Sequence, residues 1–469
     1  MNIWIFPYFI SFLVLGLLIF RSKKIANSLM ATLLFVGTLN ADIPLPGLEI
    51  IKYAGGAAFG KIFLFDVVLL LCVCFLFLTG SMDLKLFKSN LFILLILIFC
   101  VEMLSVLGEE NLGLGVFQLL QSLKGIVYII VLFNFIKNDE KLLFVSRVLL
   151  YILLFHTTVA MLEFFKGGNV GLSVLGENVQ IPGNITEEGT IASAVQVTGL
   201  TGGANTFGIF LLMMIPYSIA CYLSKIRFIN KKLNGMICIL AFFVSMSIMS
   251  KAIMLIMPIG VLITFFFCYG KNVRSSRIVY FSLFLCSILL FGYLSFRDVI
   301  MDQFFGISHN IFFSLAKRME YIRVAILEIS QNPILGVGLN NHAFLFKGSG
   351  LIPAHSAIHN YYLHIAAESG LSALFLFLCL MLSLFKTLMA LRKSEIEMIR
   401  TLSAGILSGM ICLSIAILVF WSLKRQSAFF IFCTMIGITI KLGEMKRKMR
   451  QVNSEIGNSE NVILQGITY

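Results

Sequence analysis

Three of the six histidines in this 469-residue chain lie within ten residues of one another, at the start of the stretch HSAIHNYYLHIAAESG (355–370). Asn360 and Glu368 belong to the same stretch, and a long apolar run follows it. A histidine titrates near neutral pH, so it can act as a general base and take a proton from a hydroxyl group. The residue types therefore indicate acid–base chemistry at the entrance to an apolar segment.

A metal site is the alternative interpretation, because His355 and His359 are four residues apart and would share one face of a helix. The nearest carboxylate, Glu368, lies nine residues beyond His359 and is poorly placed as a third ligand. We therefore expect no metal ion and no cofactor. Taken singly, His309, His342 and His364 are expected to form hydrogen bonds with loop carbonyl groups.

Two arginines belong to FFSLAKRMEYIRVAILEIS (312–330), where apolar residues recur at helical spacing and predict an amphipathic helix. Arg318 lies at the edge of the apolar stripe, and Arg323 lies further round, three residues after Glu320. The Asn-Pro pair at 332–333 is expected to end this helix.

The segment after that proline contains Gly336 and Gly338, which could form a backbone nest for an anion. The alternative is an ordinary turn beside a membrane.

Two lysines also lie where a charge is costly or unexpected. Lys124 is inside an apolar segment, so it either faces a polar cavity or pairs with an acid such as Glu102. Lys251 lies between two apolar segments and could face the same cavity.

The composition decides what kind of fold must position these groups. The chain is 59% hydrophobic and 13% charged, with a mean hydropathy of +0.96. A helix needs about 20 mostly apolar residues to cross a bilayer, and the chain has many such runs. The runs are too long and too evenly apolar for the alternating strands of a barrel. We therefore predict an all-α, polytopic membrane protein with 12–13 membrane-spanning helices.

The thirteen predicted spans are 3–20, 27–46, 61–80, 91–108, 115–136, 141–165, 205–223, 234–249, 252–269, 277–296, 365–388, 400–421 and 425–442. Basic residues concentrate in cytoplasmic loops. The basic loops fall on one side if the N-terminus is outside the cytoplasm. The segment SLKRQ (422–426) contradicts this assignment, and Lys251 does so in part. The net charge of +13 is explained by such loops, so we expect no binding of nucleic acid.

This topology places two long loops outside the cytoplasm, 166–204 and 297–364, and the second contains five of the six histidines. The predicted organisation is an N-terminal helical region 1–296, the large loop 297–364, C-terminal helices 365–442 and a cytoplasmic tail 443–469. The tail beyond residue 450 is polar and is expected to be disordered.

The stretches RMEYIRVAILEISQNPILGVGLNNH and HNYYLHIAAESGLSALFLF together resemble the bacterial superfamily of O-antigen ligases and of O-antigen and exopolysaccharide polymerases. The resemblance covers about residues 318–372. The matching residues are Arg318, Pro333, Gly336, Gly338, His359, Asn360, Leu363, Glu368 and Gly370.

A second external motif of that superfamily is similar to VTGLTGGANTFG (197–208), in which Gly199 and Asn205 fit. The arginine expected before it is replaced by Gln196 or Val197. In SKAIML (250–255), Lys251 stands where a related element has arginine.

The resemblance implies a glycosyltransferase in the bacterial cytoplasmic membrane, with its active site facing the periplasm or the cell exterior. Its donor would be a glycan on undecaprenyl diphosphate, its acceptor another glycan or a lipid-linked glycan, and neither metal nor nucleotide sugar would be used. A flippase and a chain-length regulator would be its candidate partners.

The resemblance also implies roles for individual residues. Cations must neutralise the leaving diphosphate, and arginine suits phosphate best. Arg318 is the first candidate, followed by Arg323, Lys251 and Lys124. His359 is the candidate base, and Glu368 would orient it or replace it. The remaining substrate-binding candidates are Asn360, Asn205, Gly336 and Gly338.

Three functions remain open at this level. A polymerase would extend a repeat-unit polysaccharide of the O-antigen, capsule or exopolysaccharide type, and this is the function we predict. A ligase would join the finished chain to lipopolysaccharide core. A lipid-linked glycan flippase or another transporter would explain the spans, but not a large external loop that holds most of the histidines.

Overall fold

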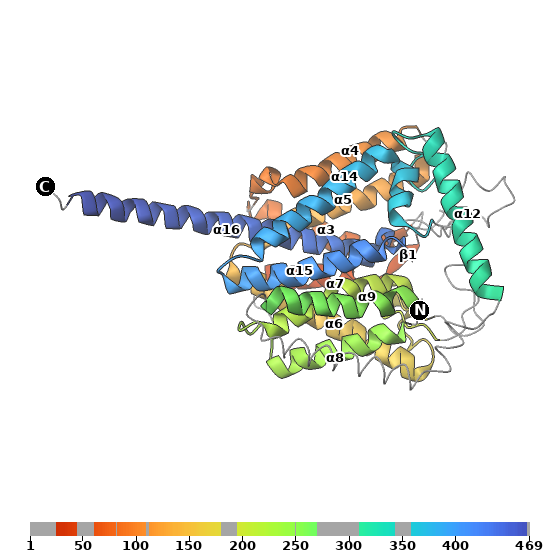
Figure 1. Ribbon diagram of the computed structural model, residues 1–469, viewed down its shortest axis with the longest axis horizontal. Coiled ribbons are helices and arrows are strands. Elements are labelled where there is room, and N and C mark those ends of the chain that lie inside the picture. The colour runs from red at the N-terminus through yellow and green to blue at the C-terminus, as the bar shows by residue number, and fades with distance from the viewer. Residues whose placement is uncertain are drawn as a thin grey trace.

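The computed structural model describes residues 25–44, 61–80, 82–108, 112–179, 195–248, 250–269, 309–342 and 358–466. Helices that run side by side form most of this part of the chain (Figure 1). The helices are α2 (Ile25–Gly37), α3 (Leu64–Leu78), α4 (Asn90–Val106), α5 (Leu112–Phe135), α6 (Asp139–Lys166), α7 (Ala204–Leu223), α8 (Lys231–Ser247), α9 (Lys251–Tyr269), α12 (His309–Gln331), α14 (Tyr361–Leu391), α15 (Glu397–Ala416) and α16 (Gln426–Gly466).

The short elements are the 3-10 turns η2 (Leu84–Lys88), η3 (Ser173–Leu175) and η6 (Ser422–Lys424), and the strands β1 (Asp42–Pro44) and β2 (Lys61–Phe63), which pair antiparallel.

Seven of the helices are long and apolar enough to cross a membrane: α5, α6, α7, α9, α14, α15 and α16. Three shorter apolar helices, α2, α3 and α4, accompany them. The prediction of an all-α, polytopic membrane protein is therefore confirmed. Two predicted spans, 3–20 and 277–296, lie outside the described residues, and each of the others overlaps a helix. The span 27–46 is too long, because α2 ends at Gly37 and the strand β1 follows.

The core of the bundle is α7, whose side chains are buried almost without exception, and it packs against α15, α9 and α8. Gly405 and Gly409 of α15 form a Gly-x-x-x-Gly pair that faces α7. A Cβ atom at Gly409 would lie 2.8 Å from the carbonyl oxygen of Met213, and one at Gly405 would lie 2.9 Å from Cα of Tyr217. Small residues let membrane helices approach this closely, so the pair determines the distance between α15 and α7.

We expect Gly409→Leu to prevent this close packing and to lower the yield of folded protein sharply. Adding a large side chain to a well-packed core costs about 1–3 kcal/mol, and more where backbone is in the way. The measurement is the yield of monodisperse protein on size-exclusion chromatography after detergent extraction. Gly443→Leu in α16 is the matched control, because a Cβ atom there would meet nothing within 4 Å. Equal yields from the two variants would contradict the expectation.

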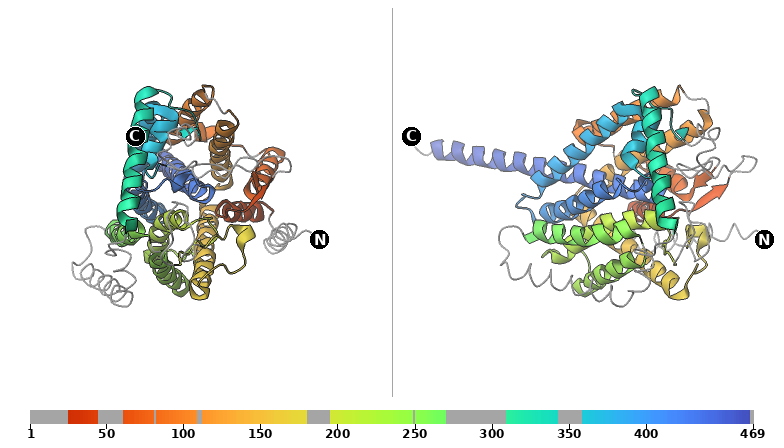
Figure 2. Two further views of the ribbon diagram at one scale, coloured as in Figure 1. Left: turned by 90° about the vertical axis from the view of Figure 1, so that its right-hand side faces the viewer. Right: turned by 45° about the vertical axis from the view of Figure 1, so that its right-hand side comes forward.

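The helix α12 runs across one end of the bundle instead of along it, and packs on α14 (Figure 1). Seen along the bundle, α12 lies along one edge, whereas α16 lies among the other helices (Figure 2). The prediction of a helix over 312–330 within the large loop is confirmed by α12.

Two contacts place both predicted external loops at this same end. The Ser427 hydroxyl donates to the carbonyl of Thr201 (3.3 Å), and Nζ of Lys424 donates to Oδ1 of Asn340 (2.8 Å). Thr201 belongs to the first long loop and Asn340 to the second, while Lys424 ends η6 and Ser427 lies in the first turn of α16.

The opposite end of the bundle carries basic connections. The backbone N–H of Lys225 donates to Glu397 (2.5 Å), and Nζ of Lys446 donates to the carbonyl of Ala390 (2.9 Å). Beyond this end α16 projects away from the other helices (Figure 1). The expectation of a disordered tail after residue 450 is wrong, since α16 continues as a helix to Gly466.

Candidate functional site

A sharp bend divides α14 at Gly370, which has φ 79° and ψ 173°. The bend admits the chain that follows α12: the Leu371 N–H donates to the carbonyl of Pro333 (2.8 Å). A Cβ atom at Gly370 would lie 2.0 Å from the carbonyl oxygen of Ile334, so only glycine fits. The bend makes residues 361–369 a short separate segment at the head of α14.

The Gly336-x-Gly338 motif packs on that short segment. The N–H of Val337 donates to the carbonyl of Ala367, and the N–H of Gly338 donates to the carbonyl of Glu368, both at 2.9 Å. The N–H of Gly336 donates to the carbonyl of Asn332 (3.0 Å). An anion nest needs N–H groups that point at the anion, so these contacts favour the turn over the nest, the two alternatives that the sequence left open.

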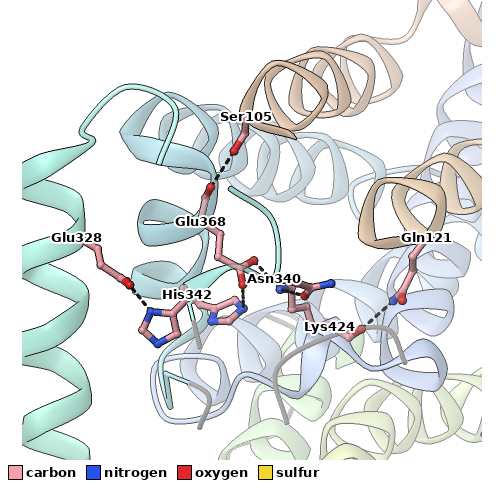
Figure 3. Close-up of polar contacts among 8 residues, drawn as sticks. Ser105, Gln121, Glu328, Asn340, His342, Glu368 and Lys424 are labelled. Atoms are coloured by element: carbon pink, nitrogen blue, oxygen red, sulfur yellow. Dashed lines mark hydrogen bonds and ion pairs between the residues drawn. The ribbon is translucent and has the colours of Figure 1, made fainter. Parts of the chain in front are cut away.

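A buried ion pair joins the short segment to η6, the turn that precedes α16. Nζ of Lys424 lies 2.5 Å from Oε2 of Glu368, and the two side chains are 5% and 2% exposed. Nζ of Lys424 also donates to Oδ1 of Asn340 (Figure 3). Because Glu368 is buried and engaged by this cation, its surroundings favour a role in holding the site over a role as the base.

The backbone around the ion pair is bonded to two further helices. The Ser105 hydroxyl of α4 donates to the carbonyl of Glu368 (2.8 Å), and the Gln121 amide of α5 donates to the carbonyl of Lys424 (2.7 Å) (Figure 3). Oε1 of Glu368 lies 3.2 Å from Nε2 of His364, which is also buried. His364 thus faces a carboxylate one helical turn away, whereas a loop carbonyl was predicted.

A second buried pair attaches the loop to α12. Nδ1 of His342 lies 2.5 Å from Oε2 of Glu328, and both side chains are 4% exposed. Burial raises the pKa of Glu328, and the hydrogen bond and charge of His342 offset part of that rise. This pair holds the loop against α12 on one side, and the hydrogen bond from Lys424 to Asn340 holds it against η6 on the other.

The candidate base, His359, lies two residues before α14 and is half-buried. Its ring is 6.1 Å from the ring of Tyr321 in α12, measured between centroids. Its neighbour Asn360 caps α14, since Oδ1 of Asn360 accepts from the N–H of Leu363 (3.1 Å). The helix cap is therefore a structural role that explains an asparagine at position 360.

Arg318 lies one helical turn before Tyr321, on the side of α12 that faces the head of α14, and is half-buried. Tyr321, Val324, Ala325 and Glu328 are the buried residues of that side. Arg323 is exposed on another side of the helix. The fold therefore places Arg318, but not Arg323, on the same side of α12 as the ring that contacts His359.

The other candidates are distributed over neighbouring elements. Lys124 pairs with an acid, one of the two predicted alternatives, and that acid is Asp66 of α3 (2.8 Å). Lys124 lies on the face of α5 that also carries Gln121, one turn before it. Asn205 lies in the first turn of α7 and is half-buried, and Lys251 begins α9.

The motif at 197–203 is held by Glu163 at the end of α6. Oε2 of this fully buried carboxylate accepts from the N–H groups of Thr198 (2.7 Å) and Gly199 (3.0 Å). The loop that precedes Asn205 is thereby fixed beside the start of α16, where Ser427 contacts Thr201. Both external motifs therefore meet at residues 424–427.

Sequence reasoning missed the role of Lys424. The available signal was its position in SLKRQ, the one basic segment wholly on the wrong side of the predicted topology. A buried charge with a carboxylate partner is not a cytoplasmic loop charge, so the contradiction disappears for Lys424. Arg425 is accounted for in part by its position over the Trp421 ring, 4.8 Å from the ring centroid.

Metal ligation is the alternative interpretation of the histidine spacing, and it needs several ligating side chains close together among the described residues. Among them, no group of three or more His, Cys, Asp or Glu side chains could hold a metal ion. His355 lies outside the described residues.

Comparison with known proteins bears on the central part of the chain. Residues 236–378 match the family model described as O-antigen ligase. No curated protein matches the chain. The matched region includes most of α8, together with α9, α12, the Gly336-x-Gly338 turn and the bent head of α14. The match supports the resemblance of residues 318–372 to the superfamily of O-antigen ligases and polymerases.

Proposed function

We propose that the protein is a membrane glycosyltransferase that takes a glycan from a polyprenyl-diphosphate carrier and acts as a repeat-unit polymerase. The observation that carries the proposal is the junction of α12 with the head of α14. Arg318 and His359 lie there on facing elements, within the region that matches the O-antigen ligase family. A phosphate-binding cation and a candidate base are the two groups that this reaction requires.

In the proposed reaction, an acceptor hydroxyl oxygen attacks the anomeric carbon of the donor glycan. A bond forms between that oxygen and the anomeric carbon, and the bond from this carbon to the diphosphate oxygen breaks. His359 takes the hydroxyl proton, and the lipid diphosphate leaves with the bonding electron pair. One displacement of this kind inverts the configuration at the anomeric carbon.

The leaving diphosphate gains negative charge, and fixed cations stabilise that charge before it develops. Arg318 is the primary candidate because its guanidinium can bind phosphate oxygens in two places. Lys124 and Lys251 are secondary candidates near the membrane, and Arg323 is a candidate for contacts with more distant phosphate or glycan. Asn205 is a candidate for contact with the donor from the second external motif.

The position of the site supports an extracytoplasmic reaction. The two long loops meet at one end of the bundle, and basic connections gather at the other. Basic ends of membrane proteins face the cytoplasm. A lipid-borne diphosphate at the opposite surface would reach the junction of α12 and α14 at the level of the lipid headgroups.

The test is to give purified protein, in lipid nanodiscs, the lipid-linked glycans extracted from the host strain after deletion of this gene. A polymerase is expected to turn this single substrate into a ladder of longer lipid-linked chains, visible after electrophoresis of the released glycans. A ligase would leave it unchanged until lipopolysaccharide core is added. A flippase would leave the lipid-linked glycan unchanged both without and with lipopolysaccharide core, and that result would contradict the proposal.

A further inference from the structure

Lys424 is a buried cation beside a membrane-spanning helix, where an unpaired charge would be costly. Its side chain is 5% exposed, and the residue ends η6, just before the last membrane-spanning helix. Removing an ammonium group from water is costly, so a buried lysine is retained with a carboxylate and further hydrogen bonds. Glu368 and Asn340 supply these at 2.5 and 2.8 Å (Figure 3).

The two partners of Lys424 belong to the two segments that build the candidate site. Glu368 ends the short helical segment whose other end carries His359 and Asn360. Asn340 belongs to the loop that the His342–Glu328 pair holds against α12. One ammonium group therefore bonds both the segment that carries the candidate base and the loop attached to the helix that carries Arg318.

The backbone around these partners leaves little freedom elsewhere. The other end of the short segment is bonded to α15, since the N–H of Tyr361 donates to the carbonyl of Ile417 (2.9 Å). Asn340 has φ 61°, a conformation that asparagine tolerates better than most residues. The Lys424 carbonyl is itself bonded by Gln121. The segment that carries Glu368 and the backbone of Lys424 are thus also held by hydrogen bonds of their own.

We propose that Lys424 is a positioning residue, which holds the head of α14 and the 336–342 loop at the spacing that glycan transfer requires. This rests on the proposed function, because the positioned groups are its candidate base and cation. Lys424 itself is not proposed to contact substrate. Its charge is already satisfied by Glu368, whereas a catalytic cation would have to face the diphosphate.

The test compares the effect on kcat with the effect on stability in three variants: Lys424→Met, Lys424→Met with Glu368→Gln, and Asn340→Gly. Lys424→Met leaves the Glu368 carboxylate buried without its cation, so both the thermal midpoint and kcat are expected to fall. Lys424→Met with Glu368→Gln removes both charges, so the thermal midpoint is expected to recover. The ties to Asn340 and the carboxylate remain broken, so kcat is expected to stay about 10²-fold low, the scale of a 1 Å misplacement.

Asn340→Gly provides a variant that keeps the ion pair. Glycine retains the backbone conformation at φ 61° but removes the oxygen that Lys424 binds. We expect kcat to fall at least tenfold, with the KM for the extracted lipid-linked glycan changed less than twofold. The thermal midpoint should stay near that of the wild type.

The matched control is a buried ion pair within α16. Nζ of Lys441 lies 2.6 Å from Oε2 of Glu444, and these side chains are 5% and 7% exposed. They lie towards the opposite end of the helix, away from the candidate site. Lys441→Met with Glu444→Gln is expected to leave kcat unchanged, whatever it does to the thermal midpoint.

A double variant at Lys424 and Glu368 that recovers both stability and wild-type kcat would overturn the proposal. An Asn340→Gly variant with wild-type kcat would overturn it as well. This second result can be obtained even if the double variant does not fold. These failures differ from failure of the proposed function, in which the wild-type protein itself would transfer no glycan.

Discussion

His359→Ala is expected to lower the kcat for glycan transfer about 10²–10⁴-fold, the usual contribution of a positioned acid–base group. The variant should still bind the donor, because the imidazole is proposed to act on the acceptor hydroxyl. The KM for lipid-linked glycan should therefore change little. The measurement is initial rate against concentration of glycan extracted from the deletion strain, with the purified protein in nanodiscs.

The pH dependence gives an independent check on the same residue. A histidine base must be neutral to accept a proton, so the wild-type rate should fall as the pH is lowered. In His359→Ala the residual rate should lose this acid limb. A variant that keeps wild-type activity and the same acid limb, at wild-type protein level, would exclude His359 as the base.

Arg318→Ala is expected to lower kcat about 10²–10³-fold, as removal of one group that stabilises transition-state charge does in other enzymes. Arg318→Lys keeps a positive charge but loses the planar fork that binds phosphate in two places. The lysine variant should therefore recover only part of the rate. The same nanodisc assay measures both, and the length of polysaccharide made in cells provides a second readout.

The control for Arg318 is its neighbour Met319, which is 59% exposed on α12. Met319→Ala should leave the rate and the protein level unchanged. Arg323→Ala, on the exposed side of the same helix, should have a smaller effect than Arg318→Ala. If Arg318→Ala and Met319→Ala transfer glycan equally well, the diphosphate is stabilised elsewhere, and the proposed role of Arg318 is wrong.

Most of the fold could be predicted from local properties. A run of about 20 apolar residues is enough to predict a membrane helix, because the bilayer leaves the backbone few alternatives. The amphipathic helix over 312–330 was predictable from its spacing, and Asn332-Pro333 correctly ended it. The continuation of α16 beyond residue 450 was not, because polar composition alone does not exclude a helix that extends an existing one.

The candidate site was predictable only where its residues lie close together in sequence. The resemblance over residues 318–372 identified the region that the family match later included. It did not predict the surroundings of Gly336 and Gly338: the N–H of Gly338 donates to the carbonyl of Glu368 in α14, and that of Gly336 donates to the carbonyl of Asn332. Spacing of glycines predicts a turn, but it does not say what the turn packs against.

The sequence by itself determined the membrane-spanning character of the chain, the helix that carries Arg318, and the stretch that carries His359 and Glu368. These follow from hydrophobicity and periodicity, which act over one helix at a time. Only the tertiary structure decided that Lys424 belongs to Glu368, that Lys124 belongs to Asp66, and that Arg318 and not Arg323 faces the head of α14. The residues of each ion pair are more than 50 positions apart, and their pairing depends on how the helices pack. A buried charge in a membrane protein pairs with the opposite charge that helix packing brings near it, and the local sequence pattern does not show which residue that is.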